Sequence, residues 1–371
     1  MIRIKVLVVA ADPAPGMVPF VATIANTLTD DDRFDIYALV TNTKHLSYTK
    51  NFSKKIKVVS IEYPAKPFKK LLFKLYSKQL FDAFSDLIKR IQPDVVHIMV
   101  GDFVFANYNL NRYSLNKKTC VTVHDLYPHE RERIPFKERL IRKIMIYQSN
   151  KFISKIGNLT TSSLSQFSEL KKLYPKKNIC YTHFPTLVTS AIKQGRMCVT
   201  ELKNIDNYIL FFGSVEKYKG VDLLIDAFSS LKMNKDIKLV IAGKGDVYDS
   251  RNPNIIRLNR FIEDEEIADL FMRSLFVVYP YISATMSGVL SLAYYFRKRV
   301  LLSDVQFFKD NKTPSCTFFR NGDSYDLKEK LNQMICQNVN LQTEDYYKSI
   351  YSDKVLADDY FSLYSNIINN M

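Results

Sequence analysis

Residues 208–213 read Tyr-Ile-Leu-Phe-Phe-Gly, and residues 221–231 read Val-Asp-Leu-Leu-Ile-Asp-Ala-Phe-Ser-Ser-Leu. The first run is short, apolar and closed by a glycine, which is typical of a buried strand. In the second, apolar side chains return every three or four residues, which predicts a helix with one buried face. A strand that leads into a helix is the first half of a βαβ unit, so this stretch indicates an α/β fold with a parallel sheet.

The same alternation extends in both directions along the chain. Before residue 186 it predicts strands at Ile4–Ala10, Phe34–Val40, Ile56–Ile61, Val95–Met99, Thr119–His124 and Leu159–Ser162, with long helices at 68–91 and 136–156. After residue 206 it predicts strands at Lys238–Ala242, Leu275–Pro280 and Val300–Ser303, with helices at Asp264–Arg273 and Ser287–Phe296. Ligands of such folds bind at the carboxyl ends of the strands, so the loops there are the candidates for chemistry.

The length of 371 residues is comfortable for two cores. Residues 186–206 lack strong periodicity, and we expect the chain to cross between domains there. The fold class predicted is therefore α/β, with two Rossmann-like doubly wound parallel-sheet domains, an interdomain cleft, and domain bounds of 1–190 and 200–355. Residues 356–371 are predicted to form a C-terminal helix that packs back on the N-terminal domain.

The positive charge is confined to the first half of the chain. Residues 1–185 carry 30 Lys and Arg against 15 Asp and Glu, whereas residues 186–371 carry 23 of each. This asymmetry favours an anionic partner for the first half, such as phospholipid headgroups, a pyrophosphate-linked acceptor or nucleic acid, although lysine-rich surfaces can also serve solubility alone. No recognised nucleic-acid-binding module occurs, so a nucleic acid is not the expected partner.

The five cysteines are odd in number and widely spaced, without a CxxC or Cys/His cluster, so neither a disulfide framework nor a metal site is expected. The start of the chain reads as a strand rather than a signal peptide. No run of about 18 apolar residues is present to span a membrane. We therefore expect a cytoplasmic protein with reduced thiols.

The loop of residues 213–220, Gly-Ser-Val-Glu-Lys-Tyr-Lys-Gly, joins the predicted strand at 208–213 to the helix that follows. Lys219 stands just before the helix, where backbone N–H groups and the helix dipole already favour an anion. A lysine there suits phosphate as a mobile point charge. The alternative is an ordinary solvated loop lysine.

A second loop, residues 283–289, reads Ser-Ala-Thr-Met-Ser-Gly-Val and again lies between a strand and an apolar helix. Its small residues allow a ligand to approach the backbone closely. Ser287 could cap the helix, or its hydroxyl and the amides after it could hold a phosphate, and the sequence alone does not separate these roles.

Two further candidates lie in the first half. His124 ends the strand predicted at 119–124, where it could hydrogen-bond a sugar hydroxyl or a reacting group. Gly16 lies in the turn after the first strand, where backbone N–H groups could approach an acceptor or a diphosphate. His97 sits inside an apolar run and is interpreted as a core histidine.

Taken in order, residues 211–228, 239–246 and 260–305 resemble the donor domain of the retaining GT-B glycosyltransferases of family 4. The segment VTVHDLYPH at 121–129 resembles the histidine segment of that family. The Ser-Gly-Val loop and the LAYYF after it resemble a subgroup in which this loop stands where two glutamates eight residues apart are usual.

The resemblance implies the roles of several residues. His124 would lie near the transferred sugar, Lys219 would contact the donor diphosphate, and Ser287, Gly288 and Val289 would hold the distal phosphate or the sugar. Gly213, Ser214 and Thr285 of the same loops are further candidate donor-binding residues, and the turn of Gly16 is the candidate acceptor-side loop. The resemblance also implies a reaction without a cofactor or metal, because Lys or Arg and a helix N-terminus neutralise the leaving pyrophosphate. The donor would be a nucleotide sugar and the acceptor a lipid-linked saccharide or a polysaccharide of the bacterial cell surface.

Departures from the family pattern keep a second hypothesis open. Ser214 stands where the family commonly has Arg, and Ala284 and Leu292 stand where it has glutamates. These changes favour, as the alternative, a non-catalytic GT-B-like subunit of a glycosyltransferase complex. A nucleotide-sugar epimerase shares the architecture but would require carboxylates that the sequence does not place.

Residues 136–147 mix basic and apolar side chains at helical spacing, with Leu140, Ile144 and Tyr147 on one stripe. Such a helix could rest on anionic lipid, or it could pack on the first sheet with a solvated basic side. The charge of the first half favours the lipid, and with it peripheral attachment to the inner face of the cell membrane.

Overall fold

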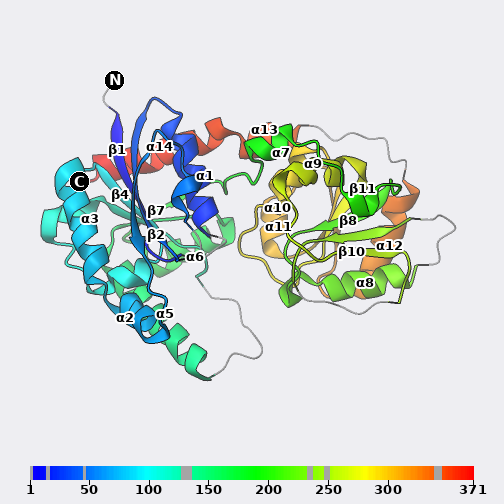
Figure 1. Ribbon diagram of the computed structural model, residues 1–371, viewed down its shortest axis with the longest axis horizontal. Coiled ribbons are helices and arrows are strands. Elements are labelled where there is room, and N and C mark those ends of the chain that lie inside the picture. Colours follow the sequence, from blue (N-terminus) through cyan, green and yellow to red (C-terminus); the bar gives the residue numbers. More distant parts are fainter. Residues whose placement is uncertain are drawn as a thin grey trace. The chain divides into compact units, whose positions relative to one another are not determined.

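The computed structural model describes residues 3–13, 17–44, 47–126, 136–231, 237–245, 251–337 and 345–371. The chain divides into two compact units. The first comprises residues 1–185 with 353–371, and the second comprises residues 186–352. Each unit is a parallel sheet with helices packed on it (Figure 1).

The sheet of the first unit has seven strands in the order β3-β2-β1-β4-β5-β6-β7. These are β1 (Ile4–Ala10), β2 (Phe34–Asn42), β3 (Lys57–Glu62), β4 (Val95–Val100), β5 (Thr119–Thr122), β6 (Asn158–Thr161) and β7 (Asn178–Tyr181), all paired in parallel. The helices of this unit are α1 (Met17–Thr29), α2 (Pro67–Leu75), α3 (Lys78–Ile91), α4 (Leu115–Lys118), α5 (Phe136–Lys155), α6 (Leu164–Leu173) and α14 (Asp353–Asn369).

The sheet of the second unit has six strands in the order β10-β9-β8-β11-β12-β13. These are β8 (Tyr208–Phe212), β9 (Leu239–Ala242), β10 (Ile255–Leu258), β11 (Ser274–Tyr279), β12 (Val300–Ser303) and β13 (Cys316–Phe319), again all parallel. The helices are α7 (Ser190–Gln194), α8 (Val221–Ser229), α9 (Asp264–Arg273), α10 (Val289–Tyr295), α11 (Gln306–Asp310), α12 (Ser324–Cys336) and α13 (Tyr346–Tyr351). The prediction of two Rossmann-like parallel-sheet units is confirmed.

The C-terminal helix α14 belongs to the first unit, although it follows the whole second unit in sequence. Its Tyr364 hydroxyl lies 2.9 Å from Nδ1 of His97, whose Nε2 lies 2.8 Å from the Thr122 hydroxyl. Burial lowers the pKa of His97 to about 3. His97 is therefore a neutral core histidine with both ring nitrogens bonded, as its apolar surroundings in the sequence predicted.

Several predicted bounds differ from the structure. The helix predicted at 68–91 is two helices, because Tyr76 is extended and the Ser77 hydroxyl caps α3 by accepting from the Leu80 N–H. Strand β5 ends at Thr122, so His124 lies in the loop after it. The strands β7, β10 and β13 are additions to the prediction. Each is a run of only four residues that includes a polar residue, so its apolar pattern is too short to predict a strand. Pairing with a neighbouring strand places each of them in its sheet.

The order of the strands indicates where a ligand is expected to bind. In each sheet the strand order reverses once, between β1 and β4 in the first and between β8 and β11 in the second. At such a point the loops leave neighbouring strands in opposite directions, and a crevice opens at the carboxyl edge. The loops after β8 and β11 are residues 213–220 and 280–288.

Candidate functional site

The loop after β8 presents a buried lysine. Residues 217–219 form one turn of 3₁₀ helix, and Gly220 then takes the left-handed conformation, with φ of 63°, to start α8. A side chain at Gly220 would meet the carbonyl of Pro280, because a Cβ there would lie 2.2 Å from that oxygen. Glycine at this position thus lets the loop after β8 press against the end of β11, and this places Lys219 between the two.

Lys219 is only 7% exposed. Its ammonium donates a 2.7 Å hydrogen bond to the Ser214 hydroxyl, which in turn donates to Glu216 at 3.0 Å. It also lies 5.6 Å from the ring centre of Tyr281. Burial lowers its pKa from 10.5 to about 8, and the charge of Glu216 opposes this in part. The alternative of a solvated loop lysine is therefore wrong.

The loop after β11 approaches the same place. Helix α10 begins at Val289, with Gly288 as its N-cap, so Ser287 precedes the cap and does not fill the capping role that the sequence allowed. The Ser291 hydroxyl instead bonds the backbone near the start of this helix. It donates to the Gly288 carbonyl at 2.6 Å and accepts from the Leu187 N–H at 2.9 Å. Thr285 and Ser287 are partly exposed.

Gly213 is the point at which the two loops meet. A Cβ on Gly213 would lie 3.4 Å from Nζ of Lys219, 4.0 Å from the Tyr281 hydroxyl and 3.9 Å from a methyl group of Val289. The side chains of Lys219, Tyr281 and Val289 therefore border one small space beside Gly213, at the carboxyl edge of the sheet. Of the predicted donor residues, Gly213, Ser214, Lys219 and Val289 are brought together here.

Sequence reasoning missed two contributors to this arrangement. Tyr281 lies two residues after the end of β11 and is 1% exposed. Gly243, after β9, packs so closely on the loop after β8 that a Cβ there would lie 2.0 Å from the Gly213 carbonyl. The signal for Gly243 was present in the sequence, as a glycine at the end of a strand, whereas a tyrosine at the end of a strand reads as core.

His124 lies at the carboxyl edge of the first sheet. Its Nε2 lies 2.6 Å from the Met99 carbonyl and so carries the proton, and its ring packs edge-on against Phe20, with centroids 5.1 Å apart. Burial lowers the pKa of the ring. Its Nδ1 is buried and has no hydrogen-bond partner among the described residues, which leaves an acceptor there.

Gly16 lies outside the described residues. Its neighbour Asp12, at the end of β1, is partly buried, and burial raises the pKa of its carboxyl while the charge of Lys74 lowers it by less. Asp12 and Gly101 stand at the ends of β1 and β4, the two strands between which the order of the first sheet reverses.

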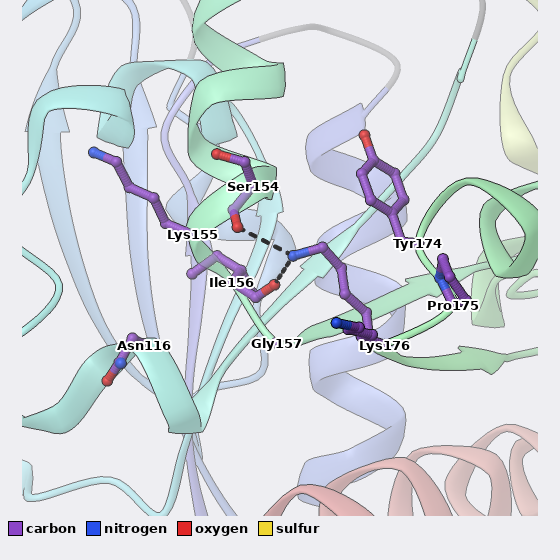
Figure 2. A pocket seen from close by; sticks show the side chains of 9 residues that line it. Asn116, Ser154, Lys155, Ile156, Gly157, Tyr174, Pro175 and Lys176 are labelled. Atoms are coloured by element: carbon purple, nitrogen blue, oxygen red, sulfur yellow. Dashed lines mark hydrogen bonds between the residues drawn. The ribbon is translucent and has the colours of Figure 1, made fainter.

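A hollow of about 490 Å³ lies at the opposite, amino edge of the first sheet, where β5, β6 and β7 begin (Figure 2). Two of its three lysines already have partners in the backbone. Lys155 donates to the Ala106 carbonyl at 2.9 Å, and Lys177 donates to the carbonyls of Ile153, Ser154 and Ile156 at the end of α5. The ammonium groups of Lys155 and Lys177 therefore already serve backbone carbonyls, and the hollow is not developed as an anion site.

In the part of the chain that the structure describes, no three side chains of His, Cys, Asp or Glu gather closely enough to hold a metal ion. Within the same ranges, no helix combines the length and the apolar character that crossing a membrane requires. All five cysteines are free thiols.

Residues 206–337 match the family model of group 1 glycosyl transferases. This match lies within the second unit. Comparison with curated protein sequences finds no match.

Solved structures similar to the whole chain include sucrose-phosphate synthase of Thermosynechococcus elongatus, with 12% identity, a TM-score of 0.72 and coverage of 100% of each chain. They also include HepE of Anabaena in complex with UDP and glucose, with 12% identity, a TM-score of 0.68 and coverage of 98% of this chain and 100% of that one. A glycosyltransferase of Rickettsia africae has 14% identity, a TM-score of 0.68 and coverage of 100% of each chain. At these identities the likeness shows the fold, which is that of the GT-B glycosyltransferases.

Proposed function

We propose that this protein is a retaining glycosyltransferase that moves a hexose-type sugar from a nucleotide-sugar donor to a lipid-linked or polysaccharide acceptor. The second unit supplies the donor site and the first unit supplies the acceptor side. The similar fold of HepE, which binds UDP and glucose, supports a nucleotide-sugar donor.

One observation carries the proposal, namely the buried ammonium of Lys219 at the start of α8. The Lys219 ammonium is buried and donates to a neutral serine hydroxyl rather than to a carboxylate. Burial of a charge in this way lowers the stability of the fold, and strongly perturbed ionisable groups of this kind are concentrated at functional sites. An anion at this point would interact with Lys219 and with the backbone N–H groups that begin α8.

This arrangement gives Lys219 its chemical role. As the bond between the sugar and the phosphate breaks, negative charge gathers on the leaving nucleoside diphosphate. Lys219 and the start of α8 stabilise that charge in a site with little water, where a fixed charge acts strongly. The proposed reaction therefore uses no metal. Ser287, Thr285 and the Gly288 backbone would hold the distal phosphate or the sugar, and Nδ1 of His124 would accept a hydrogen bond from a sugar hydroxyl.

A second candidate function has its own support. Ala284 and Leu292 bring no carboxylate to the donor loop, and Leu292 is buried in the core. Ser214 offers a neutral hydroxyl rather than an arginine cation. These positions favour the alternative of a non-catalytic partner subunit that binds a donor or acceptor without turning it over.

Turnover separates the two functions. The protein is incubated with UDP-, GDP- and ADP-sugars and with lipid-linked saccharide acceptors, and the products are analysed by mass spectrometry. A product heavier than the acceptor by one hexose, with the anomeric configuration of the donor retained in NMR spectra, is the expected result. Binding of a nucleotide sugar without any product would instead establish the subunit role.

The acceptor is proposed to be reached at an anionic membrane surface, and two neighbouring helices support this. On α2 and the residue after it, the apolar side chains of Phe68, Leu72 and Tyr76 are 71%, 47% and 56% exposed. Leu140 and Tyr147 of α5 are 52% and 69% exposed. Such side chains, at helical spacing, can enter the boundary between headgroups and acyl chains.

The two helices touch and are strongly basic. The Lys74 ammonium of α2 lies 3.6 Å from the Met145 sulfur of α5, and the Gln148 amide donates to the Lys74 carbonyl at 3.3 Å. Residues 66–78 hold five lysines and no acid, and residues 136–155 hold six Lys or Arg and one Glu. Each basic residue near an anionic surface contributes about 1 kcal/mol, so this charge suits anionic lipid.

Flotation with vesicles tests the membrane proposal. We expect binding to vesicles that contain phosphatidylglycerol, weakening with salt, and reduced by Arg139→Glu with Arg142→Glu and by Phe68→Ser with Leu72→Ser. The charge change should act mainly at low salt, whereas the apolar change should act at all salt concentrations. If the wild-type protein stays in solution with anionic vesicles at low salt, the membrane proposal fails and the donor-site proposal is unaffected.

A further inference from the structure

We propose that the Tyr281 hydroxyl binds the diphosphate of the nucleotide sugar and so replaces, in part, the cation that Ser214 does not supply. This inference rests on the proposed function of the loops after β8 and β11. It adds to that function a residue that neither the sequence nor the family resemblance assigned.

The first observation is that the hydroxyl is buried without a partner. Tyr281 is 1% exposed, and its hydroxyl makes no hydrogen bond to any residue that the structure describes. Burial raises its pKa, and the nearby Ser287 hydroxyl lowers that pKa by less, without a hydrogen bond of normal geometry. A buried hydroxyl without a partner is costly, and native proteins keep few of them.

The second observation is where the hydroxyl points. It lies 4.0 Å from the position that a Cβ of Gly213 would take, and Nζ of Lys219 lies 3.4 Å from the same position. The Tyr281 hydroxyl and the Lys219 ammonium thus converge on one small space at the carboxyl edge between β8 and β11. A phosphate oxygen that accepts from both would satisfy the cation and the hydroxyl together.

The backbone of Tyr281 is held firmly while its hydroxyl is not. The Ser303 hydroxyl donates to the Tyr281 carbonyl at 2.5 Å, and the ring packs against Tyr279, Phe308 and Tyr218. In the structure, Lys219 lies against this ring while its Nζ donates to Ser214. Exchange of that hydrogen bond for one to a phosphate moves the lysine away from Ser214 and gives the phosphate access to the tyrosine.

Tyr279 provides a matched control. It is also fully buried and lies two residues earlier, but its hydroxyl donates to the Val289 carbonyl at 3.3 Å. Removal of a hydroxyl that has a protein partner should lower the melting temperature, whereas removal of the Tyr281 hydroxyl should leave it unchanged or raise it. The two Tyr→Phe changes remove the same atom from similar surroundings.

The experiment measures the melting temperature of the protein and its affinity for UDP, inorganic pyrophosphate and uridine by calorimetry. Tyr281→Phe is expected to bind UDP and pyrophosphate about ten-fold more weakly, to bind uridine as before, and to melt no lower than wild type. Tyr279→Phe is expected to melt lower and to bind UDP as wild type.

Other outcomes overturn the inference. If Tyr281→Phe binds UDP and pyrophosphate as wild type while Lys219→Met does not, the hydroxyl does not contact phosphate and the proposed donor site stands. If Tyr281→Phe melts lower to the same extent as Tyr279→Phe with unchanged affinity, the hydroxyl has a structural role. If wild type binds neither UDP nor pyrophosphate, this inference falls together with a UDP-sugar as the donor.

Discussion

Replacement of Lys219 by methionine should stabilise the ligand-free protein and weaken donor binding at the same time. Methionine keeps most of the apolar stem that packs beside Tyr218 and Tyr281, and it removes the buried charge. A fall in pKa from 10.5 to about 8 corresponds to about 3 kcal/mol by which the folded state disfavours the charged form. This cost is present at pH 7, below the folded pKa, and it disappears only as the pH rises toward 10.5.

The loss in binding can be estimated from the same group. A charge-assisted hydrogen bond to phosphate contributes about 1.5–3 kcal/mol, so Lys219→Met should weaken UDP binding about 10- to 150-fold. The melting temperature should rise by up to about 5–10 °C, since about 3 kcal/mol is regained in a unit of this size. Calorimetric titration with UDP and thermal denaturation at pH 7 measure the two effects on one preparation.

Lys217→Met is the matched control, because Lys217 belongs to the same turn but is exposed. It should change both quantities little. The reasoning is refuted if Lys219→Met binds UDP as tightly as wild type, or if it melts lower. A lower melting temperature would mean that the ammonium stabilises the fold through its bond to Ser214 rather than being held for a ligand.

Three further outcomes are expected. UDP affinity should fall as the pH rises above about 8, where Lys219 in the free protein loses its proton, and calorimetry between pH 7 and 10 should find no such fall in Lys219→Met. His124→Ala should lower the rate of sugar transfer at least about 100-fold. It should cost about 1–2 kcal/mol of stability, since the ring loses only its bond to the Met99 carbonyl and an edge contact with Phe20. Transfer at the wild-type rate would exclude a role of His124 in the reaction. His97→Ala should do the reverse, unfolding at clearly lower temperature with normal transfer by the folded fraction, because both of its ring nitrogens are bonded in the core.

Much of the fold was readable from short stretches of sequence. The bounds of β1, α9 and β12 agree with their predictions residue for residue. Each of these segments has a strong local signal, either a short apolar run or an acidic first turn followed by a helical period. The steric preferences that produce such signals act within a few residues, so they do not depend on the rest of the chain.

The candidate site was readable in part. The sequence placed Lys219 before a helix and identified the loops after two strands, because a glycine-bounded loop between a strand and a helix is itself a local pattern. It could not tell whether Lys219 is solvated or buried, or whether Ser287 caps the helix. The burial of Lys219 depends on the end of β11, where Pro280 packs against Gly220. The role of Ser287 depends on where α10 begins, and the structure has Gly288 as its N-cap.

What the sequence alone determined is most of the succession of strands and helices, the charge of the first half, and the side chains offered by each loop. The tertiary structure decided which of them meet. Gly213 and Tyr281 are 68 positions apart and share one space because β8 and β11 are neighbours in the sheet. His97 is satisfied by Tyr364, 267 residues away. Burial, the pKa of a lysine and the partner of a hydroxyl all depend on such distant segments, since they are set by everything within a few ångströms and not by the order of the chain.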